Sequence, residues 1–547
     1  MKRILYLLLI CLWLSGVFQR VEALEMAYPK YEIRAIWLTT IGGIDWPHSF
    51  SPSIQKEELC RILDKLKSAG INTVFLQTRL RGTTIYHSSI EPWDGCITGK
   101  PGKAPNYDPL QFAIDECHRR GIQLHAWVVT IPIGKWNKLG CAQLRKKRPK
   151  MVTKIGDEGY MNPEKTETAD YLAGICSEIV KRYDVDGVHL DYIRYPETWK
   201  LRVGYQQGRT NITNIVRNIY HSVKTIKPWV MVSCSPIGKH DDLLRYSSHG
   251  WNARTTVCQD AQMWLKEGVM DALFPMMYFR DNNFFPFAID WKEHSYQRFV
   301  VPGLGIYFLD PKEGRWTIDV IERQLNVLRQ IGLGHCYFRS KFFTDNVKGI
   351  FDLGSRFDGT PSLIPPMTWM NSNRPPRPQS LTLNGGLLKW TPTETGMRDT
   401  YLLYNIYASK EYPVDITKAS NLVATRLMTN ELYVQPGIFY AVTAQDRYGQ
   451  ESDALQIEAP EFHQSSAFTP LNIRITTGII DLPSKGSTLD ADYIVIETLL
   501  GQTVEISPYR GKTLNISSLP DGIYQLRSLG RKGKNHRLGY FSLKHER

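Results

Sequence analysis

The chain has 547 residues, more than one compact domain normally holds, so its length predicts several domains. Hydrophobic residues make up 42% of it and charged residues 22%, a balance that excludes an intrinsically disordered chain. The formal charge of +13 is spread along the sequence, and no helix-turn-helix, zinc finger or aromatic RNA-binding motif accompanies it. Nucleic acid is therefore not an expected partner.

The first residues have the pattern of a secretory signal peptide, which we expect to span 1–23. Lys2 and Arg3 precede an apolar run over 4–14, and the segment 21–23 ends on a small residue of the kind that signal peptidase prefers. No later segment has the length and apolar character of a membrane span. The sequence thus predicts an exported protein of the periplasm, cell surface or extracellular medium, with no integral membrane segment after cleavage. The eight remaining cysteines lie in or beside apolar segments, so we expect core thiols.

Short β-rich runs alternate with amphipathic stretches through the first two thirds of the chain. We expect strands at 33–40, 71–78, 122–129, 187–193, 230–235, 272–278, 300–306 and 336–340. The intervening helices are expected at 54–69, 109–120, 166–183, 212–226, 260–267 and 317–331. Eight such units favour one closed parallel barrel, here assigned to 30–355, over an open sheet. The turn after the first strand also lacks a dinucleotide-binding glycine pattern.

The helical periodicity ends after the barrel. A Pro-, Ser- and Asn-rich linker is expected at 356–378, followed by a β-sandwich at 379–460 that resembles a fibronectin type III domain through Trp390 and the strand at 440–444. A second sandwich-like domain is expected at 465–547. It weakly resembles the C-terminal sorting domains of some secreted Bacteroidetes proteins, and a plain accessory domain is the preferred interpretation. The predicted fold class is α/β, a (β/α)8 TIM barrel followed by two β-sandwich-like domains.

In a barrel of this class the active site lies at the carboxyl ends of the strands. Strand alternation in the fourth unit places His189 and Asp191 on the inner face, with Val188 and Leu190 facing the outer helices. An inward Asp at the end of a strand is costly to bury unless it takes part in catalysis, binds a metal or pairs with a base. Arg194 is the candidate base for a plain ion pair. Catalysis is the favoured interpretation.

Aromatic and polar residues at the other strand ends suit a sugar polymer, because rings stack on pyranose faces while polar groups bind the hydroxyls. The predicted substrate-binding residues are Trp37, Asp45, Trp46, Gln77, Arg79, Tyr86, His125, Trp127, His189, Tyr192, Arg194, Tyr278, Tyr307 and Asp310. The predicted partner is a polysaccharide or cell-wall glycan, and no cofactor is expected.

Three motifs together resemble the glycosyl-hydrolase-like family 10. They are Glu-Ile-Arg-Ala-Ile-Trp-Leu-Thr-Thr at 32–40, Asp-Gly-Val-His-Leu-Asp-Tyr-Ile-Arg-Tyr-Pro at 186–196 and Val-Ser-Cys-Ser-Pro-Ile-Gly at 232–238. The resemblance implies a (β/α)8 glycosidase, and bacterial members of the family are associated with hydrolysis of cell-wall glycan strands. It also implies that Asp191 is the nucleophile.

Glycoside hydrolysis needs one carboxyl group to protonate the leaving oxygen and a second to act as nucleophile or base. We expect Asp191 to be the ionised member. The acid must keep its proton near neutral pH. Glu197, on the same loop, and Asp281, beyond the sixth strand, are the catalytic candidates for that role, with Asp45 and Asp310 as further possibilities.

Other functions stay open on the sequence alone. A catalytically silent glycan-binding protein is the main alternative, because Tyr192 stands where many relatives have a second acidic residue. A glycosidase that acts on plant or host polysaccharide is another. A zinc site at His125, His189 and Asp191 is not expected, since the chain has no HExxH motif or compact His pair. A serine esterase is not expected either, because the Gly-x-Ser-x-Gly elbow is absent.

Overall fold

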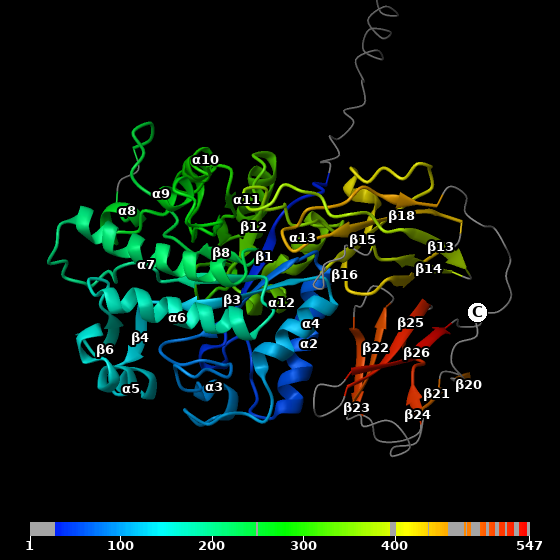
Figure 1. Ribbon diagram of the computed structural model, residues 1–547, viewed down its shortest axis with the longest axis horizontal. Helices are drawn as coiled ribbons and strands as arrows, with labels where there is room; N and C mark the ends of the chain where they lie inside the picture. The colour runs from blue at the N-terminus through cyan, green and yellow to red at the C-terminus, as the bar shows by residue number, and fades with distance from the viewer. Residues whose placement is uncertain are drawn as a thin grey trace, which may run out of the picture.

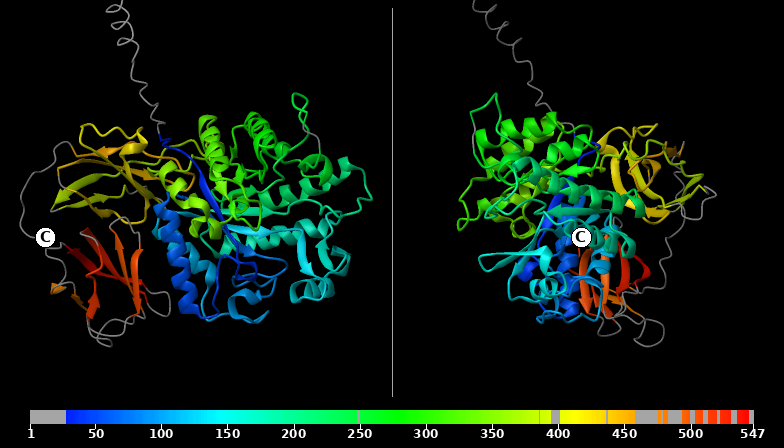
Figure 2. Two further views of the ribbon diagram at one scale, coloured as in Figure 1. Left: turned by 180° about the vertical axis from the view of Figure 1, so that it is seen from behind. Right: turned by 60° about the vertical axis from the view of Figure 1, so that its left-hand side comes forward.

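The structure is a computed structural model that describes residues 28–247, 250–384, 386–393, 401–435, 437–457, 475–476, 479–482, 493–498, 503–508, 513–519, 522–529 and 535–543. The predicted signal peptide at 1–23 lies outside the described residues. A large α/β unit, blue to green in Figure 1, stands beside two smaller β units coloured yellow to red. Both β units lie on the same side of the α/β unit in the views of Figure 2.

The α/β unit is built on parallel strands that pair in the order β10-β9-β8-β7-β3-β2-β1-β12-β11. Their bounds are β1 (Arg34–Leu38), β2 (Thr73–Arg79), β3 (Gln123–Val129), β7 (Gly187–Asp191), β8 (Met231–Cys234), β9 (Ala272–Leu273), β10 (Phe299–Val300), β11 (Gly303–Leu304) and β12 (His335–Tyr337). Each strand overlaps one of the eight expected runs, although β9 ends at Leu273, well before the expected end at 278, and this confirms the barrel class predicted from the sequence.

The seventh strand closes the barrel. β10 and β11 are consecutive parts of it, separated only by Val301 and Pro302, and they pair with β9 and β12 respectively. The N–H of Gly303 donates to the carbonyl of Pro275 (2.8 Å), and the N–H of Cys336 donates to the carbonyl of Pro302 (3.0 Å). One strand therefore bonds to neighbours on both sides, so the sheet has no free edge.

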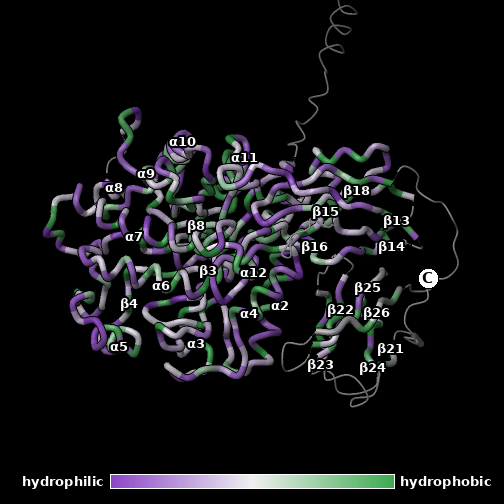
Figure 3. The backbone as a smooth tube through the Cα atoms, in the orientation of Figure 1, coloured by the Kyte–Doolittle hydropathy of each residue, from purple (hydrophilic) through white to green (hydrophobic). Residues whose placement is uncertain are grey.

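Helices cover the outside of the barrel. They are α2 (Pro52–Ser68), α3 (Gly95–Thr98), α4 (Pro109–Arg119), α6 (Thr166–Arg182), α7 (Tyr205–Ile226), α8 (Ala253–Thr256), α9 (Ala261–Lys266), α10 (Phe285–Glu293), α11 (Ile318–Gln330), α12 (Ser340–Thr344) and α13 (Ile350–Phe357). Leu59, Leu63 and Leu66 of α2 are buried, as the spacing of a one-sided helix requires. In Figure 3 the colour alternates along α6 and α7, as it does in amphipathic helices. None of the helices in the described ranges combines the length and apolar character that a bilayer span needs.

A small antiparallel sheet follows the third strand. It consists of β4 (Pro132–Lys135), β5 (Val152–Ile155) and β6 (Glu158–Met161), with α5 (Leu139–Lys147) between its first two strands. The insertion has no clear signal in the sequence, because its strands have only four residues each and little alternation. Its position after β3 brings β6 to the carboxyl end of the barrel.

The barrel interior is apolar over most of its length. Ala35, Trp37, Phe75, Trp127 and Phe274 belong to one buried cluster that is distinct from the cluster between strands and helices. Val188 and Leu190 belong to the outer cluster. The predicted alternation in the fourth strand, with His189 and Asp191 inward, is therefore confirmed.

The first β unit packs two sheets around a common core. One sheet has the order β13-β14-β17 and the other β16-β15-β18-β19. The strands are β13 (Ser380–Asn384), β14 (Leu387–Thr391), β15 (Leu403–Ser409), β16 (Leu422–Leu427), β17 (Glu431–Tyr433), β18 (Phe439–Gln445) and β19 (Leu455–Gln456). Arg426 bonds to Asp186 and Arg447 to Asp184, both at 2.7 Å, so the sandwich is attached to the amino-terminal side of the barrel. The resemblance to fibronectin type III stays a prediction.

The second β unit lies against α2 and α4. Its sheets have the orders β20-β21-β24 and β23-β22-β25-β26. The strands are β20 (Ile475–Thr476), β21 (Ile479–Asp481), β22 (Tyr493–Thr498), β23 (Thr503–Pro508), β24 (Thr513–Asn515), β25 (Gly522–Leu529) and β26 (Asn535–Leu543). The buried carboxylate of Glu497 pairs with Arg119 and with Arg527, the latter at 3.0 Å. The Glu497–Arg119 ion pair therefore joins this unit to α4 of the barrel.

The predicted linker and the cysteines both belong to the packed structure. Within 356–378, Ile364 and Met367 are buried against the barrel interior, and the indole N–H of Trp369 donates to Asp271 (3.0 Å). This segment therefore covers the amino-terminal end of the barrel.

The eight cysteines in the described part of the chain are all buried and unpaired, which confirms the expected core thiols.

Candidate active site

Asp191 lies at the carboxyl end of β7 with its carboxylate held by three donors. Its Oδ1 accepts hydrogen bonds from the Ser235 hydroxyl (2.9 Å) and the backbone N–H of Tyr192 (2.8 Å), while Oδ2 accepts one from the Trp127 indole (3.2 Å). The residue is only 7% exposed. Burial raises the pKa of this carboxyl, and the three donors and the nearby Arg194 partly oppose that rise by stabilising the ionised form. The arrangement orients one carboxylate inside the barrel.

His189 lies two residues before Asp191 on β7 and faces the barrel interior as Asp191 does. Its Nε2 accepts a hydrogen bond from the Trp37 indole (3.1 Å), and its Nδ1 lies 2.9 Å from the Ser233 hydroxyl. The ring stacks on Phe75 at a centroid distance of 4.2 Å and is fully buried. Burial lowers the pKa of His189 well below its usual value, so the ring is neutral. Its observed partners are other residues of the barrel, so His189 packs in the barrel interior beneath Asp191.

His125 occupies a similar interior position on β3. Its Nε2 lies 3.1 Å from the Gln123 side chain, and the ring contacts Phe75 edge-on at 5.3 Å. Burial lowers the pKa of His125 to about 4. The residue is therefore neutral at physiological pH and is enclosed by the barrel rather than turned toward its carboxyl end.

The depressed pKa of His125 predicts an acid-sensitive core. The unfolded chain binds a proton at this residue below about pH 6.5, whereas the folded chain binds it only near pH 4, so folding stability is lost as the pH falls between these values. The wild type should lose about 3 kcal/mol more than His125→Gln between about pH 7 and pH 4. Chemical denaturation followed by tryptophan fluorescence measures this difference. Equal losses in the two proteins would contradict the assignment.

The loop after β7 carries Tyr192, Arg194 and Glu197 to the end of the barrel. The Glu197 carboxylate accepts a hydrogen bond from Arg194 (2.8 Å) and is partly exposed. Partial burial raises the pKa of Glu197, but the hydrogen bond and the charge of Arg194 outweigh it and lower the pKa overall. Glu197 is therefore ionised in this arrangement. A general acid at this position would first have to lose its contact with Arg194.

The other acidic candidates have different surroundings. Asp45 is buried and binds Arg339 and Ser340, and burial raises the pKa of its carboxyl despite the Arg339 charge. Asp281 lies on the surface with 72% of its side chain exposed, 3.9 Å from Arg323. Asp310 is partly exposed, and its carboxylate accepts the N–H of Lys312 at 2.8 Å. No contact between Asp191 and these three carboxyl groups is observed.

Three residues that were predicted to bind substrate through polar groups form hydrogen bonds within the protein instead. The Gln77 amide oxygen accepts the N–H groups of Thr40 and Ile41. Arg79 is fully buried, binds both carboxylate oxygens of Glu91 (2.7 and 2.8 Å) and donates to two backbone carbonyls.

Tyr86 is likewise fully buried and donates to Glu178 at 3.2 Å. The expectation that Arg79 and Tyr86 face the substrate is therefore corrected, because both have their polar atoms committed to buried partners.

The aromatic residues predicted to bind substrate fall into a buried group and a partly exposed group. Trp46 is fully buried and donates to the carbonyl of Gln55 at 2.8 Å, and Trp37 and Trp127 belong to the interior cluster. Tyr278 and Tyr307 are partly exposed, with ring centroids 5.6 Å apart. Burial, together with the charges of Asp191 and neighbouring groups, raises the pKa of Tyr278 well above its usual value. Tyr278 therefore lies near Asp191 and keeps its hydroxyl proton.

Several residues that the fold brings to the carboxyl end of the barrel were not among those predicted from the sequence. Ser235 is one, although it lies in the motif at 232–238 and directly ends the fifth strand. Trp251, in the region after β8, is another, and its ring is 5.8 Å from the Arg194 guanidinium. Glu158 of the inserted sheet lies 4.0 Å from Arg81. The strand-end rule could have identified Ser235, but no sequence signal placed the other two.

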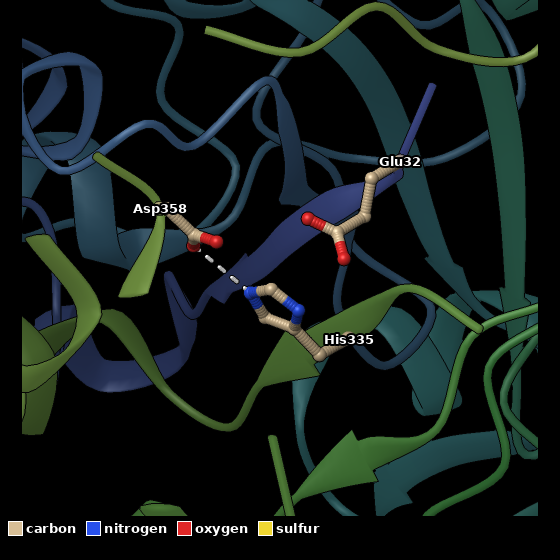
Figure 4. A group of neighbouring side chains, drawn as sticks. All are labelled: Glu32, His335 and Asp358. Carbon is tan, nitrogen blue, oxygen red and sulfur yellow. Dashed lines mark hydrogen bonds and ion pairs between the residues drawn. The ribbon is translucent and has the colours of Figure 1, made fainter. Parts of the chain in front are cut away.

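A group with the composition of a metal site occurs at the opposite end of the barrel. Glu32, His335 and Asp358 place ligand atoms close together, and His335 Nε2 lies 3.0 Å from an Asp358 carboxylate oxygen, the contact drawn as a dashed line in Figure 4. The two carboxylates also bind Arg34 and Arg329, whose guanidinium groups supply the positive charge. This group is a buried ion-pair network, and we assign it a structural role.

Comparison with known proteins finds a matching family model and several similar proteins. A model of the family described as Glycosyl hydrolase-like 10 matches residues 32–207 and 203–307, together just over half of the chain. The chain is 28% identical to Glycosyl hydrolase YngK of Bacillus subtilis over 470 residues, which cover 77% of this chain and 92% of that protein. It is 31% identical to Glycosyl hydrolase DigH of Escherichia coli K12 over 286 residues, which cover 45% of this chain and 65% of that protein. The solved glycoside hydrolase domain of PgaB from Bordetella bronchiseptica is 13% identical, with a TM-score of 0.42 and coverage of 59% and 98%.

Proposed function

Because this chain belongs to the glycosyl hydrolase-like 10 family, we propose that it is an exported glycoside hydrolase acting on a glycan polymer, with peptidoglycan glycan strands as the first candidate substrate. The observation that carries the proposal is Asp191, held by three donors at the carboxyl end of a closed barrel. The names of YngK and DigH support the hydrolase class. The predicted signal peptide supports export, and the family resemblance supports the cell-wall substrate.

The proposed reaction uses two carboxyl groups. Ionised Asp191 either attacks the anomeric carbon, from which water later releases the sugar, or takes a proton from a water molecule that attacks that carbon; in both cases the bond from the carbon to the leaving oxygen breaks. Hydrogen bonds from Ser235, Trp127 and the Tyr192 backbone keep the Asp191 oxygens in place as the sugar gains positive charge. A second carboxyl group donates its proton to the leaving oxygen.

Glu197 is the better placed of the two catalytic candidates for that second role, since it follows Asp191 on the same loop, while Asp281 lies exposed on the surface. Substrate that displaces Arg194 from Glu197 would raise the pKa of Glu197 toward that of a general acid.

A silent glycan-binding protein is the second candidate function. The observation that favours it is that Glu197 and Asp45 are both ion-paired with arginine in the structure as it stands. Neither is arranged as a proton donor. In that case the barrel would hold a glycan without cleaving it.

Digestion of purified peptidoglycan tests the proposal. The wild type is incubated with intact glycan and with glycan stripped of its stem peptides, and soluble products are identified by mass spectrometry. We expect soluble glycan fragments. If peptidoglycan is untouched, a panel of plant and host polysaccharides decides between a different substrate and the silent alternative. Binding without release from any polymer would refute the hydrolase proposal.

A further inference from the structure

A buried guanidinium lies between two exposed aromatic rings beside Asp191. The central carbon of Arg194 is 4.6 Å from the centroid of the Tyr192 ring and 5.8 Å from that of Trp251. Arg194 is 3% exposed, whereas Tyr192 and Trp251 are 36% and 43% exposed. We call these three side chains the Tyr192–Trp251 platform. The cation is covered, and aromatic surface remains open to solvent.

The platform is continuous with the candidate catalytic carboxylate. The backbone N–H of Tyr192 donates to Asp191 Oδ1 at 2.8 Å. Tyr192 has a φ of 53°, in the left-handed region that bulky residues normally avoid. Such conformations persist where the surrounding structure enforces them, and they gather at ligand-binding positions. Here the left-handed turn gives Asp191 a donor and places the Tyr192 ring over Arg194.

The charge of the platform is balanced within the protein. Arg194 Nη2 donates to the Glu197 carboxylate at 2.8 Å, and Nη1 donates to the carbonyl of Tyr195 at 3.3 Å. The neighbouring Arg81 likewise faces Glu158 at 4.0 Å. An anionic ligand would gain the attraction of each arginine but also meet the repulsion of its carboxylate partner. Aromatic faces without net charge suit the apolar C–H faces of an uncharged pyranose.

We propose that the Tyr192–Trp251 platform is the subsite for an uncharged pyranose of the glycan, adjacent to the sugar that reacts at Asp191. This inference rests on the proposed function for the position of the reacting bond. It adds a binding residue, Trp251, and a substrate class, neutral sugar, for this subsite. Glycans that carry a carboxylate on every sugar would bind more weakly, because each carboxylate would lose hydration without gaining a net attraction from the platform.

Binding to an inactive background tests the proposal apart from catalysis. The Asp191→Asn variant serves as the parent, because an amide oxygen still accepts the Ser235 and Tyr192 bonds and a bound glycan is not consumed. The probes are a pentamer of β-1,4-linked N-acetylglucosamine and an oligogalacturonate of equal length, titrated calorimetrically. In the parent we expect the neutral pentamer to bind and the acidic one to bind at least about tenfold more weakly.

Trp251→Ala in this background removes the exposed face. It should weaken binding of the neutral pentamer about tenfold, as loss of one stacking partner predicts. Tyr296→Ala is the matched control, because Tyr296 is an aromatic residue 40% exposed in the segment between α10 and β10, at the other end of the barrel. This control should bind as the parent does.

Glu197→Gln tests the role of charge, because it keeps an oxygen that accepts the Arg194 hydrogen bond and removes the negative charge that balances Arg194. Affinity for oligogalacturonate should then rise at least about tenfold relative to affinity for the neutral pentamer. Equal affinities of parent and Trp251→Ala, no binding of the neutral pentamer, or tighter binding of oligogalacturonate to the parent would each overturn the proposal. Platform-dependent binding without hydrolysis by the wild type would refute only the hydrolase function. Hydrolysis with Trp251-independent binding would refute only the platform.

Discussion

Asp191→Asn should lower hydrolysis of a glycan substrate by at least about a thousandfold. The substitution removes the negative charge that stabilises the reacting sugar and the oxygen that would bond to it. The amide keeps the shape of the side chain and an oxygen for the Ser235 and Tyr192 hydrogen bonds and loses only the longer bond from Trp127 (3.2 Å), so folding should be retained. Initial rates of fragment release from the substrate found for the wild type measure the effect.

The matched control is Asp170→Asn on the outer helix α6. Asp170 is exposed, and its carboxylate accepts a bond from the Asn218 amide at 2.8 Å, which an Asn oxygen also accepts. This variant should hydrolyse glycan at the wild-type rate. Full activity of Asp191→Asn would show that another residue supplies the reacting carboxylate.

Arg79→Met should destabilise the fold by about 3–5 kcal/mol. The substitution leaves the buried Glu91 carboxylate without the guanidinium that binds both of its oxygens, and it removes donors to the carbonyls of Val129 and Thr130. The expected result is a lower denaturation midpoint. Chemical denaturation at neutral pH, followed by tryptophan fluorescence, measures it.

The double variant Arg79→Met with Glu91→Leu separates a structural role from a binding role. Removal of both charges should recover much of the lost stability, because no buried charge is left unpaired. A substrate-binding Arg79 would behave differently. Its replacement would weaken glycan binding while leaving the denaturation midpoint close to that of the wild type, and such a result would contradict the structural assignment.

Local sequence patterns were sufficient to predict the barrel and the orientation of its fourth strand. Strand alternation depends only on neighbouring residues, so the inward positions of His189 and Asp191 follow directly from the apolar residues between them. The split of the seventh strand at Val301 and Pro302 was not predictable in the same way. It depends on which neighbours β10 and β11 meet across the barrel.

The environment of polar strand-end residues depends on partners that the local sequence pattern does not identify. Arg79 was expected at the substrate because it ends a strand, yet Glu91 lies only twelve residues further along the chain and binds it. Tyr86 meets Glu178, which comes from α6. Trp251 reaches Arg194 from the region after β8. Sequence position identifies the end of the barrel, while the fold decides which side chains point away from it.

Export, as proposed above, would make the fate of the eight buried thiols in the described residues depend on the speed of folding. In the folded protein each sulfur is sealed from solvent, and burial raises the thiol pKa of residues such as Cys117, Cys234 and Cys336, so little reactive thiolate forms. A chain that emerges unfolded into an oxidising compartment has no such protection. An exported barrel would have to close faster than oxidants cross-link its cysteines, so folding speed would set how much native protein accumulates.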